Sequence, residues 1–269
     1  MEISFYKYQG AGNDFVMIDN RSEKKLSRQD TDIINRLCDR RFGIGGDGLI
    51  LLQEHSIYGL EMVYFNADGQ EGSMCGNGGR CFVAFANHLG LINEHCTFLA
   101  VDGPHEATIN SAGNWVELKM INVEEIQQHS DYYVMDTGSP HYVTFVPVLE
   151  QVDIFQEGRT IRYSDAYKAE GINVNFVEPT EEGISVATYE RGVEDETLAC
   201  GTGVTAAAIA YFVKNPTQAF LHLRKGGNPI KAKEGNLKVR FEVAKNQFQN
   251  IWLCGPAEFV FEGKVKKSY

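Results

Sequence analysis

Short apolar or alternating runs recur along the first half of the chain and predict strands. They cover residues 2–8, 15–18, 49–52, 60–65, 97–101, 105–110 and 115–121. Successive side chains of a strand point to opposite faces, so such runs are typical of a sheet with at least one buried face. Apolar residues at helical spacing predict a helix over about 28–41, with Ser27 as its N-cap and Gly43 at its end.

The second half of the chain repeats this plan. Strands are expected over residues 132–135, 142–145, 173–177, 184–189, 219–223, 237–243 and 248–254. Each half also contains one run rich in Ala, Val and Phe that predicts a buried helix, over about 76–90 and over 204–213. The segment Asn173–Val177 echoes Asn13–Val16. An internal duplication of about 120–130 residues explains these matches.

The duplication predicts an α/β (α+β) fold of two pseudo-symmetric halves. Each half is expected to be a mostly antiparallel sheet wrapped around its central helix, with the active site in the cleft between the halves. The N-terminal half is expected over 1–125, joined by a C-terminal strand at about 258–269, and the C-terminal half over 126–257. A chain of 269 residues is long enough for two such domains.

Charge and composition narrow the partners. The formal net charge is −11, whereas nucleic acids and anionic membranes attract basic surfaces, so neither is an expected partner. We find no signal-peptide pattern and no run of the ~20 apolar residues that span a bilayer. A cytoplasmic protein is therefore expected, and its six cysteines are predicted to be free thiols.

A glycine-rich segment, Gly43–Gly48, matches the dinucleotide fingerprint G-x-G-x-x-G. In dinucleotide-binding folds this motif follows a strand and opens a helix. Here the predicted helix precedes the motif and a strand follows it, which favours a helix-to-strand turn over an NAD-dependent oxidoreductase. No cysteine or histidine spacing indicates a metal site. No cofactor or metal is therefore expected.

Two short motifs carry the candidate chemistry, Cys75–Arg80 (CGNGGR) and Cys200–Gly203 (CGTG). Each places a cysteine and small residues at the mouth of a predicted helix. The first backbone N–H groups of a helix lack partners inside it, and the helix dipole makes this end electropositive. A thiol there ionises more readily than a free one, whose pKa is about 8.5. A carboxylate could be bound by both sets of N–H groups.

The matched cysteines indicate inversion of a stereocentre by two bases. One thiolate would remove a proton from the carbon beside the bound carboxylate, and the other thiol would deliver a proton to the opposite face. The helix dipoles would also stabilise the carbanion-like transition state. Buried structural thiols, a redox pair and a non-catalytic binding protein are the alternatives. Glycine-rich polar flanks disfavour the first alternative, and the lack of a neighbouring resolving thiol disfavours the second.

Four segments, GAGNDFVMID, FNADGQEGSMCGNGGRC, GSPH and YERGVEDETLACGTG, closely resemble the diaminopimelate epimerase family, and the resemblance extends along nearly the whole chain. It implies a cofactor-independent (PLP-independent) isomerase that interconverts L,L- and meso-diaminopimelate in the synthesis of lysine and peptidoglycan precursors, and a homodimer. The nearest rival is a two-cysteine enzyme of the proline racemase type. The Glu190-Arg191 pair and the set of asparagines favour an acyclic substrate with a second amino-acid head.

The resemblance also implies residue roles. Cys75 and Cys200 match the acid/base pair. The helix-start donors to the reacting carboxylate are Gly76, Asn77, Gly201 and Thr202. The substrate-holding positions are Asn13, Asn66, Asn173, Glu190 and Arg191, of which the arginine suits a carboxylate and the others an ammonium group. His141 and Glu190 match positions that tune the thiols. A purely structural role in a turn remains the alternative for Asn13 and His141.

Two positions depart from the family pattern. Many relatives have Asn in place of Ser139, and some have Gln in place of Gly48. A serine still makes one hydrogen bond, whereas a glycine offers no side chain. Contacts to the distal end of the substrate are therefore the part of the resemblance that these two positions affect.

Overall fold

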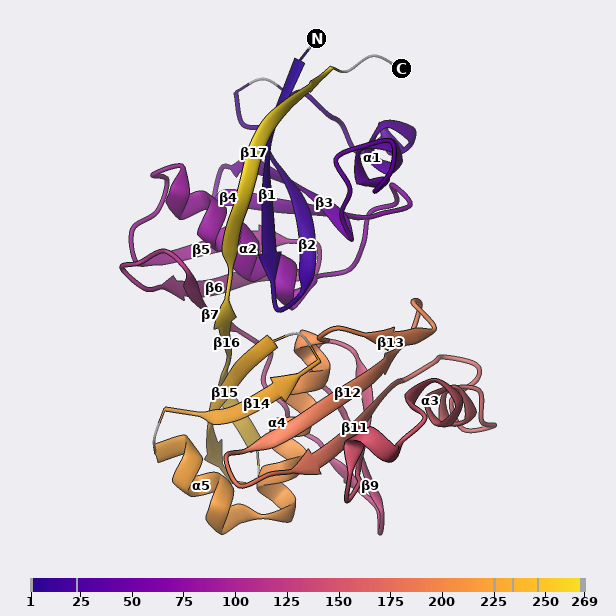
Figure 1. Cartoon of the computed structure of the whole chain (residues 1–269). Coiled ribbons are helices and arrows are strands. Elements are labelled where there is room, and N and C mark those ends of the chain that lie inside the picture. Colours follow the sequence, from indigo (N-terminus) through magenta and orange to yellow (C-terminus); the bar gives the residue numbers. More distant parts are fainter. Residues whose placement is uncertain (1, 23, 225, 234, 246, 267–269) are drawn as a thin grey trace. The chain divides into compact units, whose positions relative to one another are not determined.

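The computed structural model describes residues 2–22, 24–224, 226–233, 235–245 and 247–266. The chain divides into unit 1, which contains Met1–Leu118 and Pro256–Tyr269, and unit 2, which contains Lys119–Gly255 (Figure 1). The predicted boundaries between the two halves, after residues 125 and 257, lie slightly further along the chain than the observed ones.

Unit 1 is a sheet whose two parallel strand pairs are each connected by a helix. Its strands are β1 (Glu2–Gly10), β2 (Asn13–Asp19), β3 (Gly48–His55), β4 (Gly59–Asn66), β5 (His95–Ala100), β6 (Gly103–Ile109), β7 (Trp115–Lys119) and β17 (Glu258–Lys266). Helix α1 (Thr31–Cys38) connects the parallel pair β2–β3, and α2 (Gly76–His88) connects the parallel pair β4–β5. Parallel neighbours require such crossover connections, and the other pairings within the unit are antiparallel.

Unit 2 repeats this arrangement. Its main strands are β9 (Tyr132–Asp136), β10 (Pro140–Phe145), β11 (Asn173–Pro179), β12 (Ile184–Glu190), β14 (Asn228–Ala232), β15 (Gly235–Ala244) and β16 (Gln247–Pro256). Helix α3 (Ile154–Arg162) connects the parallel pair β10–β11, and α4 (Gly201–Lys214) lies between the parallel strands β12 and β14. The smaller elements are β8 (Gln127–Gln128), the 3-10 turn η1 (Leu149–Gln151), β13 (Asp195–Thr197) and α5 (Pro216–Arg224).

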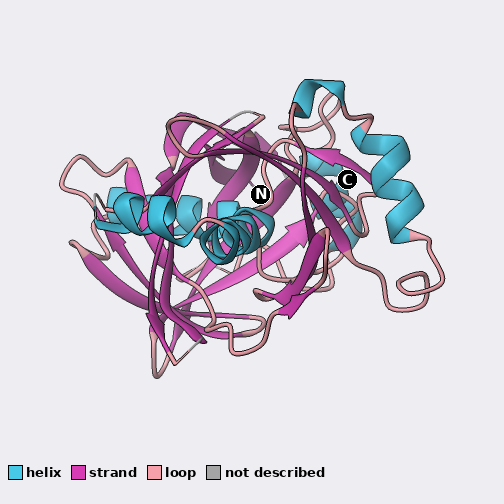
Figure 2. Ribbon diagram, turned by 90° about the horizontal axis from the view of Figure 1, so that it is seen from below, coloured by secondary structure: helices cyan, strands magenta, loops and turns pink. Residues whose placement is uncertain are grey.

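The order and direction of the strands confirm the predicted pseudo-symmetry. The series β1-β2-α1-β3-β4-α2-β5-β6-β7 corresponds to β9-β10-α3-β11-β12-α4-β14-β15-β16, with parallel pairs at the same two places in both units. In both units more residues lie in strands than in helices (Figure 2). The mixed α/β class is therefore confirmed, with antiparallel pairing in the majority.

The central helices are buried, as their sequences predict. In α2 every residue from Gly76 to Ala86 is buried, and in α4 every residue from Val204 to Tyr211 is buried. Apart from Asn77 and Arg80 in α2 and Thr205 in α4, these stretches consist of apolar residues and glycine, so no face of either helix strongly favours water. Within the described residues, no helix is long and apolar enough to cross a membrane.

The strand register shows that Asn173 and Asn13 do not occupy equivalent positions in the two repeats. Phe15 pairs with Gly48 across the parallel strands of unit 1, and His141 pairs with Asn173 across those of unit 2. Asn173 therefore occupies the repeat position of Gly48, and His141 that of Phe15. The echo was wrong because similar letters in two strands say nothing about which neighbour each strand pairs with.

Three local predictions also need correction. Residues 219–223, predicted as a strand, lie in α5, which begins at Pro216. Helix α1 is shorter than 28–41, and Asp30 precedes it, while the Ser27 amide and hydroxyl donate to the Asp30 carboxylate instead of capping the helix. Gly43 lies beyond the helix end, where a Cβ atom would stand 2.0 Å from the Arg36 carbonyl oxygen. That close approach is the reason for a glycine at this position.

Candidate active site

Cys75 is the N-cap of α2. Its backbone is extended, and its sulfur accepts a hydrogen bond from the Gly78 amide at 3.4 Å. Gly76 is buried as the first helical residue. A backbone N–H group and the helix dipole both favour a negatively charged sulfur at this place. The predicted helix-start thiol is thus present in unit 1.

A chain of side-chain hydrogen bonds ties the α2 start to the loop before β2. The Asn77 amide nitrogen donates to Asn13 Oδ1 at 2.6 Å, and the Asn13 amide nitrogen donates to Asp47 Oδ2 at 2.9 Å. The buried Arg80 guanidinium donates to Asn77 Oδ1 at 2.9 Å. The structure therefore places Asn13 beside Asn77, two residues from Cys75.

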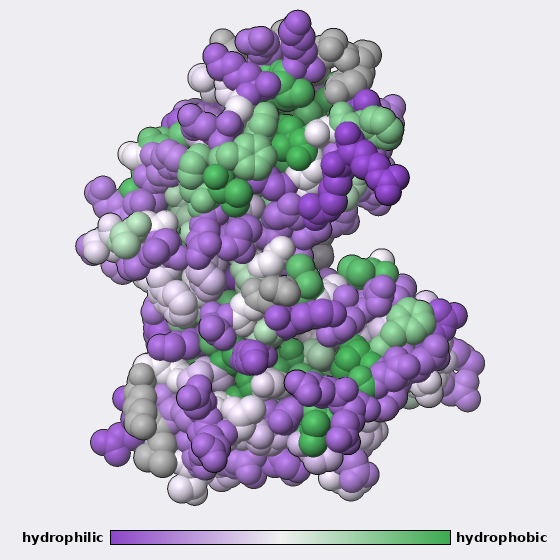
Figure 3. All heavy atoms as spheres, in the orientation of Figure 1, coloured by the Kyte–Doolittle hydropathy of each residue, from purple (hydrophilic) through white to green (hydrophobic). Residues whose placement is uncertain are grey.

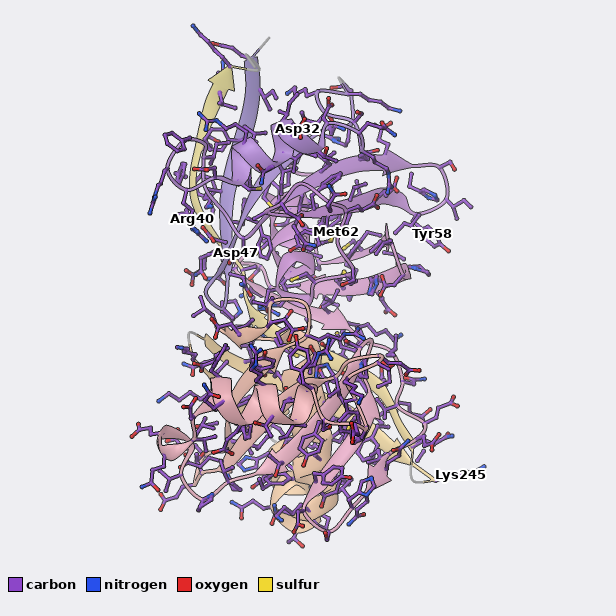
Figure 4. All side chains as sticks on the ribbon, turned by 90° about the vertical axis from the view of Figure 1, so that its right-hand side faces the viewer. Asp32, Arg40, Asp47, Tyr58, Met62 and Lys245 are labelled. Atoms are coloured by element: carbon purple, nitrogen blue, oxygen red, sulfur yellow. The ribbon has the colours of Figure 1, made fainter. Side chains whose placement is uncertain are left out.

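Charged groups fix the Asp47 end of this chain. Arg40 bridges Asp14 at 2.6 Å and Asp47 at 2.7 Å, and Figure 4 shows Arg40 beside Asp47. Lys7 forms a second ion pair with Asp14 at 2.7 Å. Burial opposes ionisation of Asp14, but hydrogen bonds from Arg40 and Lys7 outweigh it and lower its pKa to about 2.

The glycine-rich segment therefore serves the asparagine loop. Gly43–Gly48 runs from α1 to β3, as predicted, and carries the Asp47 carboxylate to Asn13. Sequence reasoning missed Asp47 because a turn acid looks like a solvated residue. The signal that the sequence did contain was the position of this acidic residue between two glycines.

Asn66 lies at the end of β4, directly opposite Gly48 of β3. Its side chain is exposed, and its backbone N–H donates to the Gln70 backbone carbonyl. A Cβ atom at Gly48 would lie 2.4 Å from the Phe65 carbonyl oxygen and 2.5 Å from the Tyr64 ring. The glycine is thus required by close packing here.

Cys200 is the N-cap of α4, and its side chain is buried. Its sulfur lies 3.4 Å from the Thr202 hydroxyl, which lies 2.8 Å from His141 Nε2. The Thr137 hydroxyl donates to the Thr202 carbonyl at 2.8 Å, and Gly201 is the first helical residue. Unit 2 thus repeats the helix-start thiol but surrounds it with side-chain hydroxyl and imidazole groups.

A second group in unit 2 collects at the ends of β11 and β12. The Asn173 amide donates to Ser139 Oγ at 2.8 Å and accepts from the Arg191 backbone N–H at 2.9 Å. The Arg191 guanidinium also reaches Ser139 Oγ, at 3.3 Å. Ser139 therefore makes contacts to both residues and orders the arginine.

The Glu190 carboxyl is largely withdrawn from water. Burial raises its pKa, and the Thr197 hydroxyl offsets part of that effect. The structure thus groups Glu190 with Arg191 and Asn173 at one strand edge. The influence of Glu190 on a thiol stays a prediction.

His141 is fully buried and neutral. Burial lowers its pKa to about 3, and the positive charge of Arg191 acts in the same direction. His141 pairs with Asn173 across the parallel strands and is hydrogen-bonded to Thr202. Both of these residues belong to the predicted site. A turn-only role for His141 is therefore excluded, because the residue lies inside β10.

The buried neutral His141 makes the protein sensitive to acid. Because its pKa in the folded chain is below the ordinary value of about 6.5, the unfolded chain binds the proton first, and stability falls as the pH drops below about 6.5. We expect His141 to contribute a loss of up to about 1.4 kcal/mol per pH unit between pH 6.5 and 4. His141→Gln should flatten that slope in urea unfolding curves, and an unchanged slope contradicts the prediction.

The remaining cysteines behave as core residues. No disulfide joins the six cysteines, all of which lie among the described residues, and Cys38, Cys81 and Cys254 are buried. Burial raises the pKa of Cys38, Cys81 and Cys96 to about 12, so these thiols stay protonated near neutral pH. Among the described residues, no group of three or more acidic, histidine or cysteine side chains could hold a metal ion.

Solved structures share this fold at low sequence identity. A PhzF-family phenazine biosynthesis protein from Bacillus anthracis matches with a TM-score of 0.73 and 13% identity, over 99% of both chains. A probable proline racemase from Agrobacterium radiobacter matches with a TM-score of 0.63 and 14% identity, over 99% of this chain and 93% of that one. These matches show that the chain belongs to this class of mixed α/β fold.

Sequence comparison identifies the family. The family model for diaminopimelate epimerase matches residues 5–125 and 133–260. A diaminopimelate epimerase from Flavobacterium psychrophilum is 51% identical over 98% of this chain and 100% of its own. One from Chlorobaculum tepidum is 40% identical over 95% and 98%. The chain belongs to the diaminopimelate epimerase family, and the predicted resemblance is confirmed.

Proposed function

We propose that this protein converts L,L-diaminopimelate to meso-diaminopimelate without a cofactor, with Cys75 and Cys200 as the acid/base pair. The observation that carries the proposal is the repeat itself, which gives each unit one cysteine at the start of its buried central helix. The relatives that match nearly the whole chain bear the name of this activity. The product would supply lysine and peptidoglycan precursors.

The reaction moves two protons and no other atoms. One cysteine thiolate takes the α-proton of the substrate, and the other thiol gives its proton to the opposite face of the same carbon. The negative charge that develops on the adjacent carboxylate is stabilised by backbone N–H groups at the two helix starts. Those donors are Gly76, Asn77, Gly201 and Thr202. After exchange with water, each thiol returns to its starting protonation state.

The second amino-acid head of the substrate would be held by the polar residues outside the helix starts. Arg191 suits a carboxylate because its guanidinium can donate two parallel hydrogen bonds. The Asn13, Asn66 and Asn173 amides and the Glu190 carboxylate suit an ammonium group. Hydrogen bonds from Arg191 to Ser139 Oγ and to the Glu170 carbonyl hold the arginine in place before substrate binds.

A direct assay tests this activity. The protein, dialysed against a chelator, is incubated with L,L-diaminopimelate, and the isomers are separated on a chiral column. We expect meso-diaminopimelate to form, with proline and trans-4-hydroxyproline left unchanged. Racemisation of proline with diaminopimelate untouched would instead favour the proline racemase type. A folded protein with free thiols that converts none of them contradicts the proposal.

The proposed state is a cytoplasmic homodimer. Strand β17 pairs with β1, and its consecutive residues Phe259, Val260 and Phe261 keep 45%, 50% and 44% of their surface exposed. The two phenylalanines pair with Tyr8 and Lys7, so they lie on opposite faces of the sheet. Figure 3 shows apolar surface on unit 1 along the course of β17 in Figure 1. Large apolar side chains exposed on a strand favour association with another chain. Free cysteines agree with a reducing compartment.

Dimer formation through β17 predicts a specific effect of charge. Phe261→Glu should convert a dimer into a monomer in light scattering, because a buried unpaired carboxylate opposes association. Ile57→Glu is the matched control, since Ile57 is 78% exposed in the β3–β4 turn of the same unit. A monomeric native protein, or a dimer that survives Phe261→Glu, contradicts this interface.

A further inference from the structure

The Cys200 thiol lies at the end of a line of buried and partly buried hydrogen bonds. The sulfur is 3.4 Å from Thr202 Oγ1, which is 2.8 Å from His141 Nε2. On the other side of the ring, His141 Nδ1 is 3.1 Å from the amide nitrogen of Asn175. Asn175 lies two residues after Asn173 in β11, and it belongs to none of the predicted site positions.

The orientation of the Asn175 amide is fixed by its other partners. Its nitrogen is 2.9 Å from the Tyr142 backbone carbonyl, which can only accept a hydrogen bond. Its oxygen accepts from the Thr188 hydroxyl at 2.9 Å. The NH2 group therefore donates one hydrogen to the Tyr142 carbonyl and its second hydrogen to His141 Nδ1.

This donor determines the tautomer of His141. Nδ1 accepts a hydrogen bond, so it carries no proton. The ring is buried and neutral, and the nearby charge of Arg191 opposes a second proton. The single proton therefore lies on Nε2, from which it is donated to Thr202 Oγ1.

The tautomer in turn determines what Thr202 does. Its hydroxyl has one hydrogen, and one of its lone pairs is occupied by the proton of His141. The hydroxyl hydrogen is therefore available to the Cys200 sulfur. In the opposite tautomer, Nε2 would need that hydrogen, and the sulfur would face an oxygen lone pair.

We propose that Asn175 is a positioning residue for Cys200, because it holds His141 as the Nε2–H tautomer and so makes the Thr202 hydroxyl a donor to the thiolate. This inference rests on the proposed function only where it treats Cys200 as a catalytic acid or base. The direction of the hydrogen bonds stands independently of which substrate binds.

Packing shows that the network is built for a fixed geometry. Asn175 and His141 are fully buried, and Thr188 is 3% exposed. A Cβ atom at Gly203 would lie 2.4 Å from Asn175 Oδ1, so α4 approaches β11 this closely only with a glycine there. Water has little access, and a reversed amide would leave buried groups without partners, which is costly.

Among the described residues, unit 1 differs at the position that corresponds to His141. Phe15 occupies the repeat position of His141, and the Cys75 sulfur receives its hydrogen bond from the Gly78 backbone N–H. A backbone N–H can only donate, so its direction needs no control. The sulfur atoms thus have different neighbours in these two contacts, a backbone N–H at Cys75 and a side-chain hydroxyl at Cys200.

The first test observes the tautomer directly. In protein labelled with 15N in histidine, a long-range 1H–15N spectrum separates the two neutral tautomers, and His141→Gln identifies the His141 signals by their loss. We expect the Nε2–H form near pH 7. Observation of the Nδ1–H form, or of a charged ring, overturns the proposal.

The second test measures the thiol. In a Cys75→Ser background, the pH profile of Cys200 alkylation by iodoacetamide reports its ionisation, with unreacted protein and sites followed by mass spectrometry. Asn175→Asp places a carboxylate oxygen at Nδ1 and favours the Nδ1–H form, so alkylation near pH 7 should slow by about tenfold as the profile moves to higher pH. An unmoved profile in a folded Asn175→Asp protein overturns the proposal.

Control variants separate this role from general damage to the core. Thr188→Val removes a buried hydroxyl from the same amide but leaves both donors of Asn175, so tautomer and profile should stay native. If Asn175→Asp fails to fold, Thr202→Val should slow alkylation and Thr202→Ser should keep it fast. Equal rates in these two variants contradict the relay. None of these readouts uses diaminopimelate, so their failure is distinct from failure of the proposed activity.

Discussion

Replacing either Cys75 or Cys200 by serine should reduce epimerisation by about a thousandfold or more. A positioned general acid or base contributes about 10²–10⁴-fold, and a serine hydroxyl is a far weaker acid than a thiol. Both directions should be affected, because each cysteine removes the proton in one direction and supplies it in the other. The measurement is kcat/KM for L,L- and for meso-diaminopimelate.

A third cysteine supplies the control. Cys96 is partly buried, and burial raises its pKa to about 12, so Cys96→Ser should retain nearly full activity. A Cys75→Ser or Cys200→Ser enzyme that keeps more than about a tenth of the activity would remove that cysteine from the acid/base pair.

Arg80→Met should destabilise the protein by about 3 kcal/mol or more. The guanidinium is fully buried in α2 and donates to Asn77 Oδ1 and to the Gly76 and Pro256 carbonyls. Each buried acceptor that loses its donor costs about 1–3 kcal/mol. The change should appear as a lower midpoint in urea unfolding monitored by circular dichroism.

Arg40→Met is the matched control for Arg80. Arg40 forms ion pairs with two carboxylates, but its side chain is 58% exposed. Exposed ion pairs contribute about 0–1 kcal/mol, so this variant should lose much less stability despite its greater number of charged partners. If Arg80→Met and Arg40→Met lose the same free energy of unfolding, burial does not determine how much each arginine contributes to stability.

The predictable part of the fold was the part that apolar patterning controls. The two central helices carry long apolar runs, and the sequence repeat indicated two similar units. Helices α3 and α5 were missed or misread because their signals lie in single residues at their ends. The Asp153 carboxylate accepts from the Gln156 amide at the start of α3, and Pro216 occupies the first position of α5. Both residue types are favoured there.

The predictable part of the site was the chemistry set by local sequence. Cys75 and Cys200 could be placed at helix starts from their glycine-rich flanks. Asp47 and Asn175 could not be assigned, because their partners come from strands and turns that lie far away in sequence. The spacing of Asn173 and Asn175 places both on one face of a strand. That spacing was the available signal for a second buried amide.

Deuterium incorporation tests the two-base mechanism most directly. L,L-diaminopimelate is incubated with the protein in D2O, and the reaction is stopped after a few per cent conversion. Two thiols that each serve one face predict a meso product deuterated at the inverted carbon and recovered substrate that still carries its proton. Deuterium in the recovered substrate at the same rate as in the product would mean that a single base serves both faces, and would contradict the paired roles of Cys75 and Cys200.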